Sequence, residues 1–119
     1  MKKSGKHRPE RLAALIQESV ASALATQVKD PRVGFITVTG VTVSPDGTHA
    51  VLRVSVMGTE DEKARAFEGL ESARGFLRSN LAKTLSLRTI PELRFELDRG
   101  LEHAQRINQI LADLKRDES

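Results

Sequence analysis

A long amphipathic stretch, residues 59–87, limits the possible folds more than any other part of the chain. Thr59 and Glu62 form a capping-box pattern, in which the threonine hydroxyl accepts a hydrogen bond from the third helical amide and the glutamate reaches back. A helix should therefore begin at residue 60. Apolar residues then recur every three to four positions, which predicts a buried face along the helix. These residues are Ala64, Phe67, Leu70 and Ala73, followed by Phe76, Leu77, Leu81 and Leu85.

Gly75 divides this stretch into two parts. Glycine has no Cβ, so it loosens a helix and permits a bend. We therefore predict two helices that meet at a tight kink at Gly75. After the kink, small residues align on the face opposite the apolar stripe, where they would admit a closely approaching partner. They are Gly75, Ser79, Ala82 and Ser86.

The charge of the same stretch is uneven. Residues 72–90 contain no carboxylate, whereas acidic residues gather at 60–62, where the helix dipole favours negative charge. The pattern indicates an anionic partner, because free amides at the start of the second helix would add to the attraction of the cations for phosphate. The alternative, a glycine that merely ends one helix beside a solvated cationic face, is equally good from this segment alone. The cations are Arg74, Arg78, Lys83 and Arg88.

The N-terminal part of the chain predicts a tail and then a helix. Residues 1–8 are basic and lack apolar periodicity, which indicates a flexible tail. Pro9 suits the first turn of a helix, and Asp30-Pro31 should stop it, because the proline ring disfavours helical geometry in the preceding residue. The helix should extend to about residue 28. Its apolar stripe consists of Leu12, Leu15, Ile16, Val20, Ala23, Leu24 and Val28.

β-Branched residues predict a strand at 33–44. Its apolar side chains change phase in the middle. Ile36 and Val38 have even numbers, whereas Val41 and Val43 have odd numbers. A period of two cannot change phase unless a residue is inserted, so we predict a β-bulge at Thr39-Gly40 that returns all four to one buried face. The four are Ile36, Val38, Val41 and Val43.

A turn, two further strands and a last helix should follow. Ser44-Pro45-Asp46-Gly47 is a strong turn signal, because proline sets φ and glycine tolerates positive φ. The second strand of this hairpin should cover residues 48–57, and apolar and charged residues alternate in a third strand at 93–97. Asp98 can cap the last helix, whose stripe would be Leu101, Ala104, Ile107, Leu111 and Leu114.

The predicted fold class is α+β, with the order α-β-β-α-kink-α-β-α and a three-stranded sheet covered by helices. Residues 9–114 should form one domain, and residues 115–119 a short polar tail. The chain has 119 residues, enough for a modest core, and nothing in it requires more than a monomer. A net charge of +3 and a pI near 9.6 are compatible with a nucleic-acid partner.

Many classes of site are excluded or disfavoured. The chain has no cysteine, and therefore no disulfide, thiolate metal site or cysteine nucleophile. Its histidines, His7, His49 and His103, lie in separate predicted elements and lack the spacing of zinc ligands. No nucleophile–base pair is apparent, so we expect no metal, no cofactor, no small-molecule substrate and no enzymatic activity. No apolar run approaches the roughly 18 residues of a membrane span, and none follows the basic N-terminus as in an export signal. We therefore expect a cytoplasmic protein.

The aromatic residues are few and are assigned to the core. The chain has no tryptophan or tyrosine. Modules that bind single strands by stacking need exposed aromatic rings on a sheet, so we disfavour base stacking. The four rings are Phe35, Phe67, Phe76 and Phe95.

Short segments in a fixed order identify a family. Each is weak alone, but the set is specific and covers about residues 8–114. Together they resemble the bacterial ribosome-binding factor A family. The segments are Arg8-Pro9-Glu10-Arg11, Asp30-Pro31-Arg32, Ile36-Thr37-Val38-Thr39, Val43-Ser44-Pro45-Asp46, Val54-Ser55-Val56, Ser72-Ala73-Arg74-Gly75-Phe76-Leu77-Arg78 and Leu93-Arg94-Phe95.

The resemblance implies a type II KH-like fold in which an Ala-x-Gly kink, here Ala73-Arg74-Gly75, replaces the Gly-x-x-Gly loop. It implies a non-enzymatic factor that binds the free 30S subunit and its 16S rRNA. Such a factor assists late maturation of the subunit and processing of the 5′ end of that RNA, notably in the cold. A function that some members place in a longer C-terminal tail is not expected here. The residues expected at the RNA-facing surface are Ala73, Arg74, Gly75, Arg78, Ser79, Lys83 and Arg88.

A second function remains open, that of a protein-interaction module. The small-residue face that begins at Gly75 could receive a partner helix instead of RNA. Salt distinguishes the two, because contacts with phosphate weaken steeply as salt rises and helix packing does not.

Overall fold

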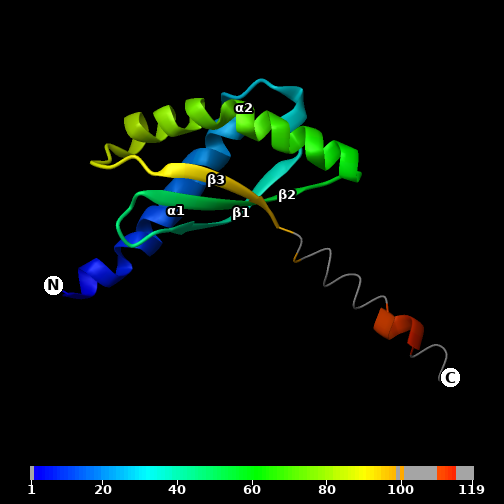
Figure 1. The fold of residues 1–119 in the computed structure, drawn as a ribbon, viewed down its shortest axis with the longest axis horizontal. Helices are drawn as coiled ribbons and strands as arrows, with labels where there is room; N and C mark the ends of the chain where they lie inside the picture. Colours follow the sequence, from blue (N-terminus) through cyan, green and yellow to red (C-terminus); the bar gives the residue numbers. More distant parts are fainter. Residues whose placement is uncertain (1, 99, 101–109, 115–119) are drawn as a thin grey trace.

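Long helices and short strands alternate along the chain (Figure 1). The computed structural model describes the backbone of residues 2–98, 100 and 110–114, and side chains from Pro9 onward. The protein is α+β, as predicted. The elements are α1 (Lys2–Thr26), the 3-10 helix η1 (Pro31–Val33), β1 (Ile36–Val43), β2 (His49–Val56), α2 (Glu60–Leu85) and β3 (Glu92–Leu97).

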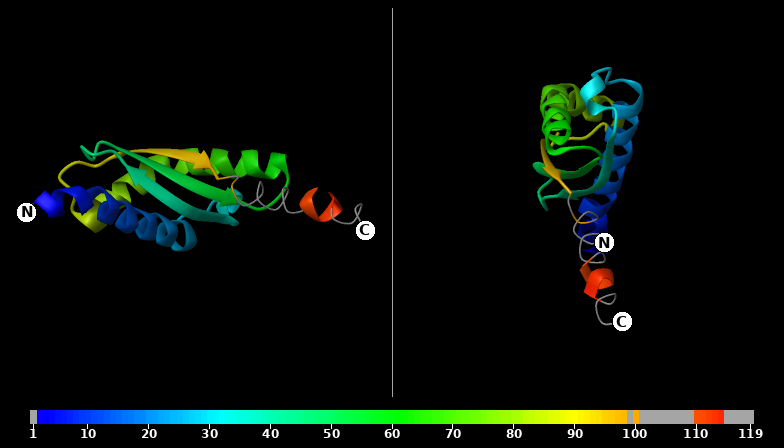
Figure 2. Two further views of the ribbon diagram at one scale, coloured as in Figure 1. Left: turned by 90° about the horizontal axis from the view of Figure 1, so that it is seen from below. Right: turned by 90° about the vertical axis from the view of Figure 1, so that its right-hand side faces the viewer.

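The three strands form one sheet in the order β1-β2-β3. β1 and β2 form an antiparallel hairpin, whereas β3 is parallel to β2 because α2 carries the chain back along the sheet. Both long helices lie on the same side of the sheet, and its other face is open (Figure 2). The buried side chains of the strands point to the helical side, so the core lies between the sheet and the helices.

The predicted β-bulge is confirmed. The pairing of β1 with β2 shifts between Val38 and Gly40, which leaves Thr39 as the inserted residue. Thr39 donates a hydrogen bond to Asp98 Oδ2 at 2.7 Å, and this bond is the main cause of the lowered pKa of Asp98. The insertion brings the apolar residues on both sides of it to the helical face. They are Ile36, Val38, Val41 and Val43.

The turn between β1 and β2 also lies where the sequence predicted it. Asp46 Oδ1 accepts hydrogen bonds from the hydroxyl of Ser44 and the hydroxyl of Thr48, both at 2.7 Å. The bonds from Thr48 and Ser44 lower the pKa of Asp46 to about 2. Gly47 has a φ of +75°, which glycine adopts without steric cost.

The core is aliphatic except for Phe95. This side chain is 4% exposed and packs in one cluster with leucines of α2 and β3, which confirms its predicted assignment to the core. Leu97 is partly buried at its edge. The other three members of the cluster are Leu77, Leu81 and Leu93.

α2 is one continuous helix, so the predicted order with two separate helices was wrong. Its predicted start is confirmed, because Glu62 N donates to Thr59 Oγ1 at 3.2 Å and Thr59 N donates to Glu62 Oε1 at 3.1 Å. The helix is unbroken, and its two halves run at an angle to each other over the sheet (Figure 1). No helix N-terminus, and hence no set of free amides, therefore exists at Gly75.

Packing explains why Gly75 does not interrupt the helix. The buried residues of α2 continue at helical spacing on both sides of it, through Leu70, Ala73, Leu77 and Leu81. A glycine in a helix costs only about 1 kcal/mol relative to alanine. Each fully buried leucine contributes about 1.5–3 kcal/mol, so the buried face determines the course of the helix.

Other differences concern the ends of the chain. α1 begins at Lys2, so it includes residues of the predicted flexible tail and contains Pro9 in its interior. A proline removes one hydrogen bond from a helix, and 25 residues tolerate that loss. Leu15, predicted to be buried, is 48% exposed. The predicted last helix lies mostly outside the described residues; residues 110–114 are helical, and their apolar side chains Leu111 and Leu114 are exposed.

The two glycines of α2 should respond in opposite ways to alanine. A Cβ on Gly75 would meet nothing within 4 Å, so Gly75→Ala should stabilise the protein by up to about 1 kcal/mol through helix propensity. A Cβ on Gly69 would lie 2.8 Å from Val33 Cγ1. Overpacking of this kind costs about 1–3 kcal/mol, so Gly69→Ala should be neutral or destabilise by up to about 2 kcal/mol. Urea denaturation of both variants checks this; a more stable Gly69→Ala would mean that η1 does not press on α2.

Candidate functional site

The cations predicted to contact RNA fall into two groups. Three have at most one exposed ion pair, and the fourth is held by several contacts within the fold. Lys83 and Arg88 are exposed and, within the described part of the chain, form no ion pair. Arg74 Nη1 lies 3.5 Å from Glu71 Oε2, in a pair whose side chains are 51% and 42% exposed. Exposed pairs of this kind are worth little, so Arg74 can exchange Glu71 for an incoming phosphate. We call these three residues, Arg74, Lys83 and Arg88, the cationic surface.

Arg78 belongs to the other group. Its guanidinium donates to the carbonyl of Ile90 at 3.0 Å and to that of Pro91 at 3.2 Å, and it lies 3.3 Å from Glu92 Oε1. These contacts join α2 to the connection that leads into β3. Arg78 therefore holds the fold through its Nε and Nη2 donors.

Removal of Arg78 should cost stability. Hydrogen bonds to a charged group contribute about 1.5–3 kcal/mol, and Arg78→Ala leaves two part-buried carbonyls with only water as a possible partner. We expect a loss of about 2 kcal/mol. Lys83→Ala, on the same helix, should change stability by less than about 0.5 kcal/mol. Urea denaturation measures both, and equal stability of the two variants would show that the contacts of Arg78 are not formed in solution.

The small residues near the cationic surface differ in exposure. Ser79 is exposed, and the space beside Gly75 is open, as the predicted small-residue face requires. Ser86 caps the end of α2 in a left-handed conformation with a φ of 50°. Ala73 is only 9% exposed and belongs to the core, so it cannot present a broad surface to RNA.

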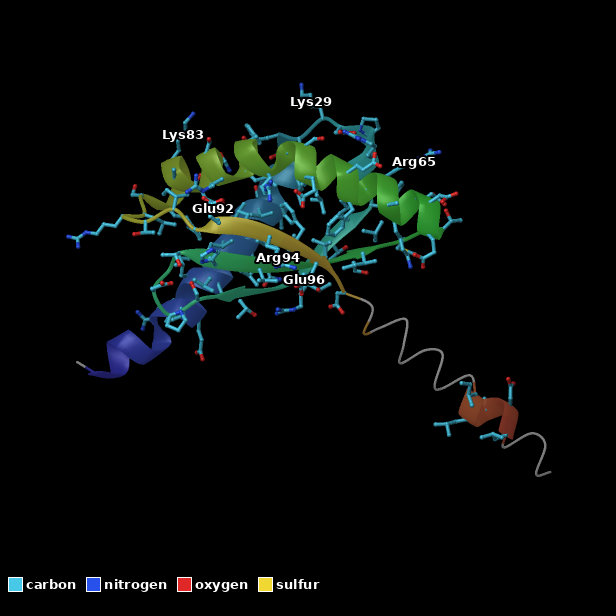
Figure 3. All side chains as sticks on the ribbon, in the orientation of Figure 1. Lys29, Arg65, Lys83, Glu92, Arg94 and Glu96 are labelled. Atoms are coloured by element: carbon cyan, nitrogen blue, oxygen red, sulfur yellow. The ribbon has the colours of Figure 1, made fainter. Side chains whose placement is uncertain are left out.

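A hollow lies beside Ala73, between α2 and the segment that follows α1. Its volume is about 270 Å³, and residues 27–30 form one wall. Phe76, 46% exposed, lies on the opposite wall. Lys29 also lines the hollow, and in Figure 3 Lys29 and Lys83 both project from the upper edge of the molecule. An exposed ring and cations on one side of the protein can accept a base and its phosphate.

Sequence reasoning missed Phe76 and Lys29 as candidate site residues. Phe76 was assigned to the core with the other phenylalanines, and Phe35, at 80% exposure, was misassigned in the same way. The premise on which base stacking was disfavoured, that the rings lie in the core, was therefore wrong for these two residues. The helical wheel offered a signal for Phe76, because the buried residues Leu70, Ala73 and Leu77 centre on another side of α2. Lys29 carried no such signal, since it reaches the hollow through the tertiary fold.

The described residues show neither a metal site nor a membrane span. In that part of the chain, no group of three or more His, Cys, Asp or Glu side chains is placed to hold a metal ion. None of its helices is both long enough and apolar enough to cross a membrane.

Comparison with known proteins gives a consistent result. A family model described as ribosome-binding factor A matches residues 8–111. Ribosome-binding factor A of Rhodopirellula baltica is 46% identical over 107 residues, which cover 90% of this chain and 78% of the relative.

Solved structures show the same relationship. The crystal structure of ribosome-binding factor A from Thermus thermophilus is similar with a TM-score of 0.68 and 27% identity, over 77% of this chain and 98% of that chain. A homology model of the Thermus thermophilus factor, fitted into a cryo-EM map of its complex with the 30S subunit, matches with a TM-score of 0.59 and 29% identity, over 72% and 90% of the two chains.

Proposed function

The chain belongs to the ribosome-binding factor A family, and we propose that it binds the free small ribosomal subunit through the cationic surface on α2 and the connection that follows it. The observation that carries this proposal is a stretch of residues 72–90 without a carboxylate, in which Arg74, Lys83 and Arg88 are exposed. Phosphate oxygens of RNA are the ligands that such a surface attracts. The relative from Thermus thermophilus, fitted into a complex with the 30S subunit, supports the choice of partner.

The hollow beside Phe76 would add to this electrostatic attraction. A base that stacks on an exposed ring gains about 1–3 kcal/mol with little dependence on its identity. Lys29, on the other wall of the hollow, would meet the phosphate of the same nucleotide. The arrangement favours an unpaired nucleotide of 16S rRNA next to phosphates along the second half of α2.

The biological role that we propose follows the family. By binding a free subunit, the protein would assist its late maturation and the processing of the 5′ end of 16S rRNA, with the greatest need in the cold. It would act as a monomer in the cytoplasm, by binding rather than by catalysis. The α-β-β-α-β order supports a relation to type II KH domains, with a continuous helix at Ala73-Arg74-Gly75 in place of a loop.

Co-sedimentation tests the proposed function. We expect the protein to sediment with purified immature small subunits in preference to mature ones and to large subunits, and to dissociate steeply as salt rises. Association that salt does not weaken would favour the alternative, a partner helix on the small-residue face near Gly75. Enrichment on mature translating ribosomes would contradict a role in assembly.

A further inference from the structure

A groove between α1 and α2 contains a second hollow, next to the hollow that Phe76 lines. The two helices run in opposite directions along it, because residues 15–22 face the last turns of α2, whereas residues 27–30 face its middle. Gln27 lines both hollows, which therefore form one continuous groove. The second hollow has a volume of about 320 Å³, and we call it the interhelical hollow. The side chains that line it include Leu15, Glu18, Ser22, Gln27, Asn80 and Thr84.

Uncharged polar side chains dominate the interhelical hollow. Asn80 is half-buried, and the other three, Ser22, Gln27 and Thr84, are exposed. Within the described part of the chain, none of these four side chains forms a hydrogen bond. Among the described residues, Glu18 is the only charged one in the lining. The hollow therefore offers amide and hydroxyl groups that the fold does not use.

Ser19, which also lines the hollow, has a hydroxyl that lacks a hydrogen-bond partner. The residue is 9% exposed, and its Oγ is buried without a partner among the described residues. Buried polar groups are almost always hydrogen-bonded, so an unpaired one requires an explanation. Rotation about the Cα–Cβ bond can turn this hydroxyl toward the hollow, where a polar group of a ligand would pair with it.

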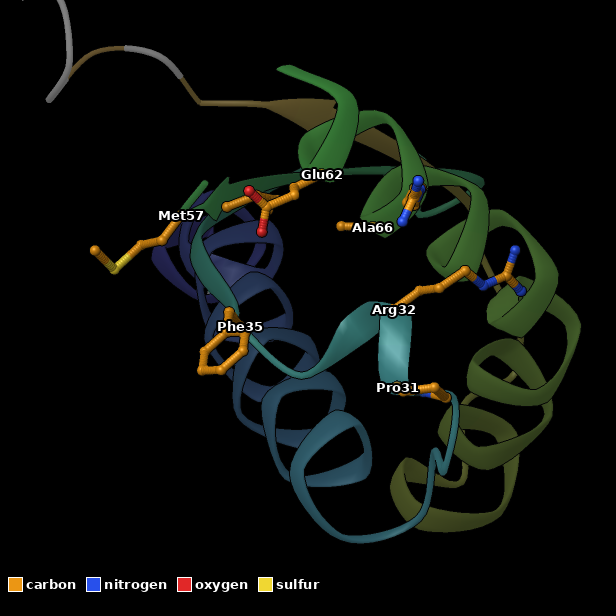
Figure 4. Close-up of a pocket in the computed structure, with 8 residues that line it drawn as sticks. Pro31, Arg32, Phe35, Met57, Glu62 and Ala66 are labelled. Carbon is orange, nitrogen blue, oxygen red and sulfur yellow. The ribbon is translucent and has the colours of Figure 1, made fainter. Parts of the chain in front are cut away.

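The hollow beside Phe35 offers no comparable set of free groups (Figure 4). Two of the charged side chains that line it are engaged within the fold. Glu62 belongs to the helix cap, and the Nε of Arg32 donates to Asp30 Oδ2 at 2.9 Å. None of the described residues that line this hollow is an Asn, Gln, Ser or Thr. Free amides and hydroxyls therefore distinguish the interhelical hollow.

We propose that the interhelical hollow binds an unpaired RNA base and recognises it by hydrogen bonds. Asn80 and Gln27 each present a donor and an acceptor to an edge of the base, and Thr84 adds a hydroxyl. Leu15, which is 48% exposed, supplies an apolar wall for the face of the base. The volume lies within the range of about 300–1,000 Å³ in which proteins bind small molecules. This inference rests on the proposed function, because the small subunit supplies the RNA.

The surroundings of the hollow favour a nucleotide over other ligands. Asn80 follows Phe76 by four residues, which corresponds to about 6 Å along the helix axis. The base in the interhelical hollow is therefore a neighbour of the base that stacks on Phe76. Lys83 lies three residues after Asn80, on the same side of α2, where it meets the phosphate. Glu18 repels a phosphate from the hollow itself. A peptide would also find hydrogen-bond partners, but Lys29 and Lys83 along the groove attract a polyanion.

Chemical footprinting of 16S rRNA tests this recognition. Purified small subunits are treated with dimethyl sulfate, which modifies A and C, and with a carbodiimide, which modifies U and G, in the presence of saturating full-length protein. We expect the wild type to protect an unpaired base that becomes reactive again with Asn80→Leu, although the variant remains bound. This substitution nearly preserves the size of the side chain and removes its donor and acceptor. Circular dichroism verifies the fold, which should be intact because Asn80 forms no hydrogen bond within it.

Two outcomes of the footprint would overturn the inference. In the first, Asn80→Leu leaves the protection of every base unchanged and binds like the wild type. In the second, the variant binds less tightly but no base changes its reactivity, which would show that a protein segment occupies the hollow.

Thr84→Val and Thr37→Val form a matched pair, because both replace a hydroxyl by a methyl group without a change in charge. Thr84 lines the interhelical hollow, whereas Thr37 is exposed on β1. Thr84→Val should weaken binding to small subunits by about fivefold, the loss typical of one hydrogen bond, with an unchanged salt slope. Thr37→Val should bind like the wild type, and equal binding of the two variants would overturn the inference.

The same experiments separate this inference from the proposed function. If the wild type fails to bind small subunits, the proposed function falls and this inference with it. If the wild type binds but the variants of Asn80 and Thr84 behave like it in both measurements, this inference alone falls.

Discussion

Phe95→Ala should destabilise the protein by about 3–5 kcal/mol, the largest effect expected of any single substitution considered. Phe95 is the only aromatic side chain among the described residues that is fully within the core, at 4% exposure. Its truncation loses the transfer free energy of the ring and leaves a cavity that the rigid contact between α2 and β3 cannot close. Domains of this size have a total stability of about 5–15 kcal/mol, so the variant should lie near global unfolding. Urea denaturation, with the slope m compared to the wild type, measures the loss.

Phe35→Ala is the matched control for this experiment. It removes the same number of atoms, but Phe35 is 80% exposed, so we expect a change below about 0.5 kcal/mol. A loss well below 1 kcal/mol for Phe95→Ala would place its ring at the surface in solution. Similar losses for both variants would mean that the assignment of one ring to the core and the other to the surface is wrong.

Local patterns predicted the sheet and its connections well. The phase change between Val38 and Val41 required an inserted residue, and the structure inserts Thr39. The capping box at Thr59 and Glu62 fixed the start of α2, since both hydrogen bonds join residues close in the sequence. Features of this kind could be predicted because the interactions that cause them are local.

The errors arose where tertiary contacts determine the outcome. Gly75 favours a break between two helices by itself, but the buried leucines on both sides of it keep α2 a single helix. Phe76 was assigned to the apolar stripe, but the buried residues of α2 centre on another side of the helix, and its half-exposed ring lines the hollow opposite residues 27–30. Arg78 matches a phosphate-binding pattern, but the chain returns beside it and its Nε and Nη2 donate to carbonyls of that segment. No pattern within a short window shows where a distant segment will pack.

The correction for Arg78 changes which residues should be replaced to test RNA binding. A variant that includes Arg78 would lose stability and affinity together, and the two losses could not be separated. The cationic surface, Arg74, Lys83 and Arg88, lacks such structural bonds, apart from the exposed pair of Arg74 with Glu71. Its replacement should therefore leave the fold intact.

Conversion of Arg74, Lys83 and Arg88 to Gln should greatly weaken binding to small subunits at low salt and flatten its salt dependence. Each phosphate contact contributes about 0.7–0.9 to the slope of log K against log salt, so three lost contacts should lower the slope by up to roughly 2–3. The measurement is a salt titration of binding, with circular dichroism to verify the fold.

Arg11→Gln combined with Arg94→Gln supplies the control for charge alone. Arg11 lies on α1, and Arg94 lies on β3, where its Nε is 3.9 Å from Glu96 Oε1. Because long-range attraction is screened within about 8–10 Å at physiological salt, cations outside the contact should change the slope far less per charge removed. If both variants flatten the slope equally per charge, the attraction comes from the net charge of the protein. If the triple variant binds like the wild type at every salt concentration, the cationic surface does not face the RNA, and α1 becomes the next surface to test.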